Sequence, residues 1–225
     1  MSAPRVVAVI AGTRPPVPAP ASLADVLVGP GALARGVAGD SDWLWLLADG
    51  ARVRGDALPR LLGAVTPAGE PAAALVAGIV LDGGGHPVDA LLPAADQSDT
   101  SLVLRLAAAR LCPVRHASFA HTLVRRADFE RFGLPDERAY GRYAPEQWTA
   151  RLLREEPGRL CAESVVTLPA MAPPNPRGLG ATFAGVAATV RMARSGVWTR
   201  GETLHAVSAL AAEAGLSRPR RAAGP

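Results

Sequence analysis

Short, uninterrupted apolar runs constrain the fold of this chain more than any other feature of its sequence. The clearest are Arg5–Ala11 (RVVAVIA), Trp43–Leu47 (WLWLL) and Ala73–Leu81. Runs of this length without polar alternation are typical of strands buried on both faces, as in the parallel sheets of α/β proteins. We therefore expect a central sheet that is flanked by helices.

Shorter segments with extended or helical patterns lie between and after these runs. Further strands are expected at Ala24–Val28, Ser118–Val124 and Val165–Leu168. Helices are expected at Gly31–Ala38, Asp56–Leu62, Ser98–Arg110, Arg126–Phe132 and Pro145–Glu156. Gly133 supplies a stop after the fourth of these helices, and Pro157-Gly158 a stop after the fifth. The pattern predicts the α/β class with a mixed, mostly parallel sheet.

The C-terminal part of the chain has a different pattern. The expected divisions are an α/β domain (1–168), a proline-rich linker (169–177), a helical hairpin (178–216) and a basic, disordered tail (217–225). Phe183, Val186 and Val190 recur at helical spacing, and Thr199 with Glu202 forms a capping-box pair before the second helix. We expect this hairpin to pack on the α/β domain.

Composition excludes several classes of protein. All 24 cationic residues are arginine, and the net charge of +4 falls to +1 without the tail residues Arg218, Arg220 and Arg221. Nucleic-acid binding is not expected, because no basic stretch is interleaved with aromatic residues. No apolar run reaches the roughly 20 residues that a bilayer-spanning helix needs. The two cysteines have no metal-ligand spacing and cannot form a disulfide framework, which indicates a reduced, cytoplasmic environment.

Asp49 is the first candidate for chemistry. It follows the run Trp43–Leu47 and precedes Gly50. Ligands of open α/β sheets bind outside the carboxyl ends of the parallel strands, where a carboxylate can meet a metal or a diphosphate. An aspartate before glycine is also the ordinary composition of a turn. From the residues alone, both interpretations stand.

Three segments resemble family 2 glycosyltransferases of the GT-A fold. The stretch Ser41–Leu62 (SDWLWLLADGARVRGDALPRLL) is similar to the metal-site segment, in which a hydrophobic strand runs into an Asp-x-Asp motif and then a helix. Leu123–Tyr143 (LVRRADFERFGLPDERAYGRY) resembles the segment of the form RR..f...GlfDe.ff.y, and Ala144–Leu152 (APEQWTARL) resembles the helix that follows it. The resemblance covers Ser41–Leu168, a little over half of the chain.

The resemblance implies a GT-A-like fold and hexosyl transfer from a nucleotide-activated sugar to a glycan or lipid-linked acceptor, in bacterial cell-envelope or polysaccharide synthesis. It implies that Asp49 faces the diphosphate or a metal and that Glu146 is the base for the acceptor hydroxyl. Arg52 and Arg138 are the candidates for neutralising the diphosphate. Trp148 takes the place of an aromatic sugar platform, although its spacing to Leu152 fits a core residue equally well.

Three features depart from the family pattern. At the place of the family's Asp-x-Asp motif this chain has Ala48-Asp49-Gly50, which leaves one carboxylate for Mg²⁺ or Mn²⁺. The acidic pair (Asp-Asp or Glu-Asp) with which the family's helix usually opens is replaced by Ala144-Pro145, with Glu146 one residue later. The N-terminal half is short, since 13 residues separate Ala11 from Asp25, and the aspartate that would read the nucleobase is absent. Two hypotheses follow: a metal-independent transferase, or an inactive binding or scaffold protein that partners an active enzyme through its C-terminal helices.

His121 is the remaining catalytic candidate. It lies in the expected strand Ser118–Val124. Histidine titrates near working pH, so it suits a base or a group that orients a hydroxyl. A buried structural histidine is the alternative interpretation. The expected location is the cytoplasm, with peripheral contact at the inner face of the membrane.

Overall fold

The apolar runs are strands of one nine-stranded sheet. The computed structural model describes residues 3–16, 23–67, 69–88, 91, 93–95, 112–169 and 179–213. The strands are β1 (Val6–Ile10), β2 (Asp25–Val28), β3 (Trp43–Leu47), β4 (Arg52–Val53), β5 (Leu75–Leu81), β6 (Ala94–Ala95), β7 (Cys112–His116), β8 (His121–Arg125) and β9 (Gly158–Thr167). Their order is β2-β1-β3-β8-β5-β9-β7-β6, and β4 pairs with the end of β9.

The strand directions confirm the expected mixed, mostly parallel sheet. Strands β1, β2 and β3 are mutually parallel, and β5 is parallel to β9. Antiparallel β8 lies between these two groups, so β1, β2, β3, β5 and β9 all end at the same edge of the sheet. Strands β4 and β7 also run against β9.

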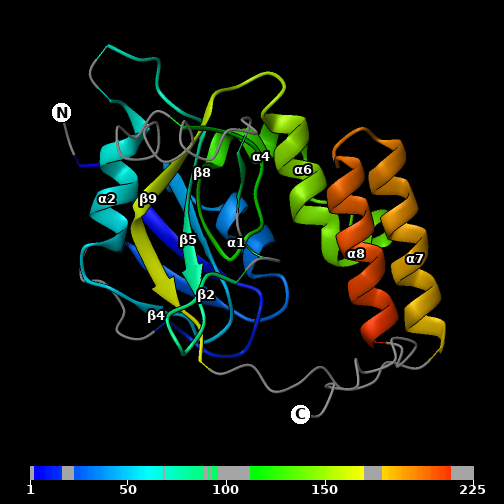
Figure 1. The fold of residues 1–225 in the computed structure, drawn as a ribbon. Helices are drawn as coiled ribbons and strands as arrows, with labels where there is room; N and C mark the ends of the chain where they lie inside the picture. The colour runs from blue at the N-terminus through cyan, green and yellow to red at the C-terminus, as the bar shows by residue number, and fades with distance from the viewer. Residues whose placement is uncertain are drawn as a thin grey trace, which may run out of the picture.

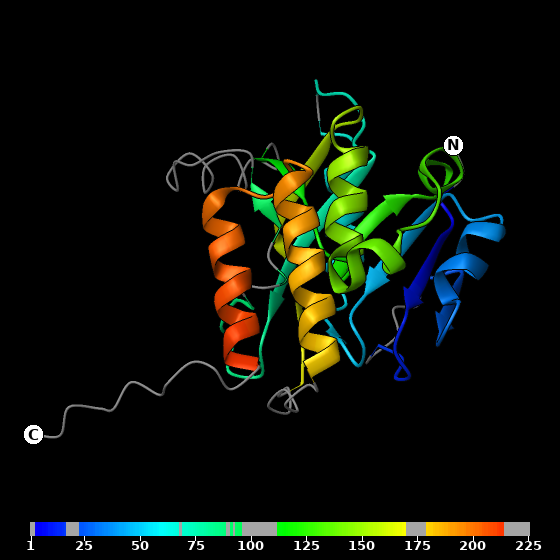
Figure 2. The same ribbon diagram turned by 90° about the vertical axis from the view of Figure 1, so that its right-hand side faces the viewer.

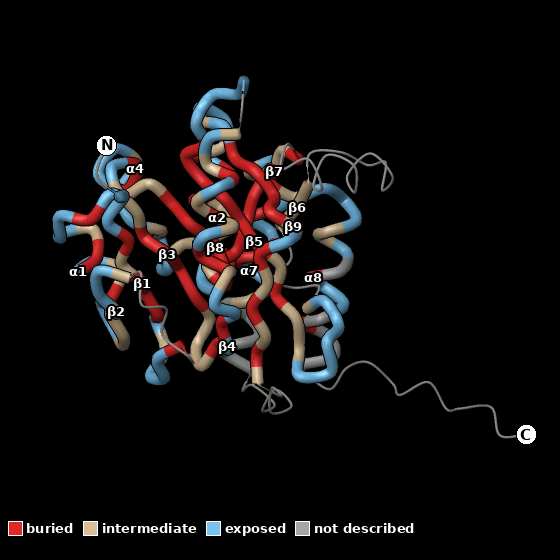
Figure 3. The backbone as a smooth tube through the Cα atoms, turned by 90° about the vertical axis from the view of Figure 1, so that its left-hand side faces the viewer, coloured by how far each residue is buried: buried red, intermediate tan, exposed pale blue. Residues whose placement is uncertain are grey.

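Helices cover both faces of the sheet (Figure 1). They are α1 (Ala32–Ala38), α2 (Ala57–Val65), α4 (Arg126–Phe132), α5 (Glu137–Tyr140), the 3₁₀ turn η2 (Gly141–Tyr143), α6 (Ala144–Leu152), α7 (Leu179–Arg194) and α8 (Arg200–Glu213). On one face, α2 buries Leu58 and Leu61 against alternate residues of β1, β3, β5 and β9. On the other face, α1, α4 and α6 pack, with Phe129 and Trp148 at the centre of that layer. The α/β class is therefore confirmed, and burial is concentrated in the strands between the two helical layers (Figure 3).

The C-terminal helices form the expected hairpin outside α6 (Figure 2). Its inner side buries Ala188, Met192 and Ala206 against Tyr143 and Ala150. The predicted capping box is present: the Thr199 amide donates to Glu202 Oε2 at 2.6 Å, and the Glu202 amide donates to Thr199 Oγ1 at 3.2 Å.

A partly buried ionic cluster also attaches the hairpin to the sheet. Glu202 Oε1 accepts a hydrogen bond from Arg115 Nη2 at 2.8 Å and lies 3.1 Å from His116 Nε2. Burial alone would raise the pKa of Glu202, but hydrogen bonds from Thr199 and the charge of Arg115 outweigh it and lower that pKa. Burial lowers the pKa of His116 despite the attraction of the neighbouring carboxylate.

Several element boundaries differ from the predictions. The strand expected at Val165–Leu168 is the end of the longer β9, and the helix expected to reach Glu156 ends at Leu152. Strands β4, β6 and β7 were not expected from the sequence. The helix expected at Ser98–Arg110, almost all of the linker and the basic tail lie outside the described residues. In the described part of the chain, no helix is long and apolar enough to cross a membrane.

Candidate functional site

The best-placed site lies at the edge where β1, β2 and β3 end. The chain passes from β1 to β2 on one side of β1 and then through α1 to β3 on its other side, so the strand order reverses beside β1. At such a reversal, the loops after neighbouring strands separate and leave a crevice in which α/β proteins bind ligands.

A pocket of about 580 Å³ opens at this edge. Its apolar wall includes Val9, Leu46 and Phe119. Its polar rim comes from the start of α5, where Asp136, Glu137 and Arg138 line it. The volume falls in the range of pockets that bind small molecules and cofactors, which are typically apolar with a few polar groups.

Asp49 does not line this pocket, but it connects the loops that follow β1 and β3, and Ala11 and Leu47 at the ends of those strands do line it. Its Oδ1 accepts hydrogen bonds from the amides of Thr13 at 2.8 Å and Arg14 at 2.7 Å. Its Oδ2 accepts from Arg14 Nε at 3.1 Å. The Arg14 amide is the main cause of the lowered pKa of Asp49, and the Arg14 guanidinium and Thr13 amide add to it. Gly12 has no room for a Cβ, because Asp49 occupies that space.

The residues at this edge do not fit a divalent cation. Both oxygens of Asp49 already accept hydrogen bonds from Thr13 and Arg14. Within the described ranges, no group of three or more His, Cys, Asp or Glu residues is arranged to hold a metal ion. Protein sites for Mg²⁺ and Mn²⁺ are built from oxygen ligands, usually carboxylates. The described residues at this edge therefore do not form a site for Mg²⁺ or Mn²⁺.

Glu146 lies in the first turn of α6, next to the pocket. Pro145 lines the pocket, whereas Glu146 is not among the lining residues. Its Oε2 is buried and has no hydrogen-bond partner among the described residues. Burial raises the pKa of Glu146 to about 7, and its own amide and the charge of Arg142 lower it only in part. A carboxyl that titrates near neutral pH is suited to accept a proton in catalysis.

His121 is enclosed in the sheet rather than in the pocket. Trp45 Nε1 donates to His121 Nδ1 at 3.1 Å, and His121 Nε2 lies 2.9 Å from Ser164 Oγ. Because indole can only donate, Nδ1 is the acceptor and Nε2 carries the proton. Ser164 Oγ in turn donates to the Ala57 carbonyl at 2.8 Å. Burial lowers the pKa of His121 to about 3, so the ring is neutral. This closed chain of hydrogen bonds favours the structural interpretation.

Trp148 is also fully enclosed. It stacks on Phe129 with ring centroids 4.1 Å apart, and Phe119 and Phe132 contact it edge-on. Its Nε1 donates to the Gly133 carbonyl at 2.6 Å. Neither ring face is open to a sugar. The contacts favour a core residue, which was the alternative interpretation of its spacing to Leu152.

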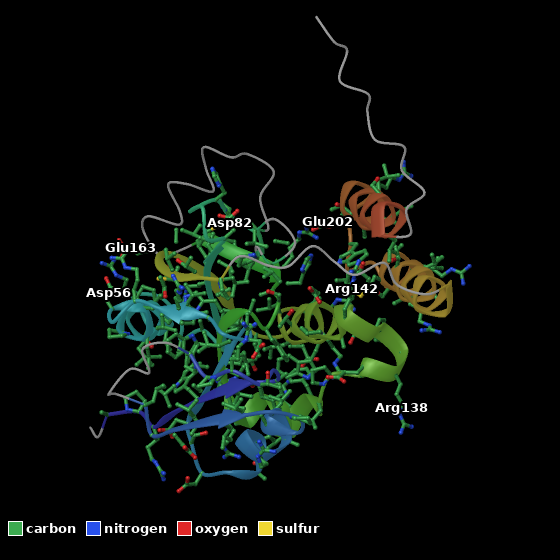
Figure 4. The ribbon with its side chains drawn as sticks, turned by 90° about the horizontal axis from the view of Figure 1, so that it is seen from below. Asp56, Asp82, Arg138, Arg142, Glu163 and Glu202 are labelled. Carbon is green, nitrogen blue, oxygen red and sulfur yellow. The ribbon has the colours of Figure 1, made fainter. Side chains whose placement is uncertain are left out.

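The two predicted diphosphate arginines are separated by the structure. Arg138 lines the pocket, and its side chain extends from α5 away from the rest of the molecule (Figure 4). Arg52 is exposed on β4, opposite Thr167, and does not line the pocket. Of the predicted site residues, the structure therefore brings only Arg138 into the lining of the pocket. Asp49 and Glu146 are close in sequence to the lining residues Leu47 and Pro145 without lining it themselves.

Sequence reasoning missed Arg14, Asp136 and Glu137. Arg14 follows β1 directly after Gly12-Thr13, and a glycine at the end of a buried strand could have drawn attention to it. Asp136 is the N-cap of α5, where its Oδ1 accepts from the Ala139 amide at 2.9 Å. In the comparisons with protein-family models and with curated proteins, the chain matches none of them.

Proposed function

We propose that this protein is glycosyltransferase-like and binds a nucleotide-activated sugar in the pocket at the ends of β1, β2 and β3. The observation that carries the proposal is the position of this pocket of about 580 Å³ at the reversal of strand order. That position is where α/β proteins bind nucleotides. The resemblance of Ser41–Leu168 to family 2 glycosyltransferases adds the class of ligand.

The lining residues suit the parts of such a ligand. Val9, Leu46 and Phe119 offer apolar surface to a nucleobase. The carboxylates of Asp136 and Glu137 can accept hydrogen bonds from ribose hydroxyls or base N–H groups. Arg138 is the cation at the rim, and its side chain, which extends into solvent, would have to turn toward the pocket to meet a diphosphate. Binding in this way requires no metal.

Transfer would use the carboxylate of Glu146. It would take the proton of the acceptor hydroxyl while the acceptor oxygen bonds to the anomeric carbon and the nucleoside diphosphate leaves. The pKa of about 7 leaves a large fraction of Glu146 ionised at neutral pH. The acceptor in this proposal is a glycan or a lipid-linked glycan, in the cytoplasm or at the inner face of the membrane.

A non-catalytic role is the second candidate. Glu146 does not line the pocket, and both oxygens of Asp49 are engaged by the loop after β1. A protein that retains the pocket but has no carboxylate placed to activate the acceptor would bind the nucleotide sugar and act through a partner enzyme. The transferase requires catalysis by Glu146, whereas the non-catalytic binding protein does not.

The test is calorimetric titration with UDP, GDP and TDP and with their glucose or mannose sugars, with and without Mn²⁺. We expect micromolar binding of one nucleotide, unchanged by Mn²⁺. Donor hydrolysis and transfer are then compared in the wild type and Glu146→Gln. Turnover that is lost in Glu146→Gln while binding persists supports the transferase. Binding without turnover in either protein supports the second candidate, and absence of binding overturns both.

A further inference from the structure

The outer side of the C-terminal hairpin exposes more apolar surface than a covered helix pair would. Val186 and Val190 on α7 are 46% and 43% exposed, and Leu204 and Val207 on α8 are 68% and 50% exposed. The inner side of α8 is apolar as well, with Ala206 and Leu210 buried. When a helix has apolar side chains on two sides and the protein body covers only one of them, we expect something else to cover the second side.

These four side chains share one face with two arginines. We call this the outer hairpin face, and it consists of Val186, Val190, Arg194, Arg200, Leu204 and Val207. The α7 members are spaced four apart, and the α8 members are spaced four and three apart, so each set lies along one side of its helix. Leu210 packs against Gly185, which sets the antiparallel alignment and brings Val190 level with the region of Leu204.

The outer hairpin face carries only positive charge. Arg194 and Arg200 are exposed, and neither pairs with a carboxylate among the residues that the structure describes. Glu202 lies on the side of α8 that faces the body, where Arg115 neutralises it (Figure 4). After Glu213 the sequence adds Arg218, Arg220 and Arg221 and no acidic residue.

We propose that the outer hairpin face docks on an anionic lipid surface. Apolar side chains bordered by arginines match the interface of a membrane, in which the apolar groups enter the acyl boundary and the cations meet lipid phosphates. A second copy of the chain fits this face less well, because twofold pairing would set the face against itself, and the outer hairpin face holds no carboxylate to pair with Arg194 and Arg200. This inference does not rest on the ligand proposed for the pocket.

Vesicle sedimentation tests the proposal with the full chain. We expect the protein to sediment with vesicles made of equal parts phosphatidylglycerol and phosphatidylcholine, and not with vesicles of phosphatidylcholine alone. The variant Arg194→Gln/Arg200→Gln should weaken binding about 25-fold, since each arginine near an anionic surface contributes about fivefold. The variant Val190→Gln/Leu204→Gln should weaken it at least tenfold by removing apolar contact.

Matched control variants change residues away from this face. Arg52→Gln removes an exposed arginine on β4, and Leu134→Gln removes an apolar side chain that is 47% exposed in the loop before α5. Both should bind anionic vesicles like the wild type. Absence of sedimentation with anionic vesicles, or equal losses in the control variants, would overturn the proposal. A concentration-dependent dimer that Val190→Gln/Leu204→Gln dissociates would also overturn it, because a second copy would then cover the face.

Discussion

The carboxylate of Asp49 accepts hydrogen bonds from both the amide and the guanidinium of Arg14. These contacts join the loop after β1 to the turn after β3 at the edge of the pocket. The side chain that resembles a metal ligand in the sequence is therefore engaged in holding two loops together. It contributes to the shape of the site rather than offering free oxygens to a cation.

Replacing Asp49 should loosen this edge. Asp49→Ala removes the acceptor of two amides and one guanidinium, so we expect the free energy of unfolding to fall by about 1–2 kcal/mol. Asp49→Asn keeps one acceptor oxygen and should lose less. Urea unfolding measures both. Asp40→Ala is the control, because Asp40 pairs with Arg5 on the open surface and should cost about 0.5 kcal/mol or less. An Asp49→Ala variant as stable as the wild type would show that the hydrogen bonds of Asp49 with Thr13 and Arg14 do not stabilise this edge.

Glu146 should make stability depend on pH. Its folded pKa of about 7 lies above the ordinary 4.5, so between these values the folded protein holds a proton that the unfolded chain has released. The contribution of Glu146 to stability should therefore fall as pH rises from about 4.5 to 7, by on the order of 3 kcal/mol. Glu146→Gln lacks this proton. The stability of this variant relative to the wild type should rise over the same interval. A difference in the free energy of unfolding that stays constant with pH would contradict the raised pKa of Glu146.

His121 should act in the opposite direction. Its folded pKa of about 3 lies below the ordinary 6.5, so the unfolded chain takes up a proton first as pH falls. Its contribution to stability is present above pH 6.5 and declines by about 1.4 kcal/mol per pH unit below it. His121→Ala should therefore cost more at pH 8 than at pH 5. An imidazole NMR titration of His121 with a midpoint near 6.5 would contradict the closed hydrogen-bond chain.

Glu202 should determine how firmly the hairpin is held. Glu202→Gln removes the charge opposite Arg115 and His116, so we expect a loss of about 1–2 kcal/mol, or a Tm lower by about 2–8 °C. Cleavage between the hairpin and the body should also become faster in limited proteolysis. Glu130→Gln serves as the control, because Glu130 forms an exposed pair with Arg126. Equal behaviour of the two variants would show that the cluster does not hold the hairpin.

The sequence indicated the strands that are apolar throughout, because burial on both faces leaves no polar position in β1, β3 or β5. It did not indicate β7, whose residues CPVRH include a proline, an arginine and a histidine. Those polar side chains are accommodated by tertiary contacts, since Glu202 from α8 accepts from Arg115 and lies beside His116. Local patterns cannot show a partner that is more than eighty residues away.

The length of β9 was missed for a related reason. Leu160 pairs with Ala77 and Val165 with Ile79, so β9 carries three more residues than β5 between these pairs. This irregularity brings Ser164 to His121, and Gly78 leaves space for the His121 ring. The role of Asp49 in binding stays a prediction, but its position directly after a buried strand was predictable from the sequence. The enclosure of Trp148 and His121 was not, because it depends on contacts between distant segments.

The most direct test of the account is titration of nucleoside diphosphates into the wild type and two tryptophan variants of α1. Ala34 is exposed and lines the pocket, whereas Ala38, one turn later, is exposed outside it. Ala34→Trp should fill the pocket entrance and weaken binding at least tenfold, while Ala38→Trp should bind like the wild type. Binding that is equal in all three proteins would place the ligand elsewhere, and no binding by the wild type would contradict the proposed function.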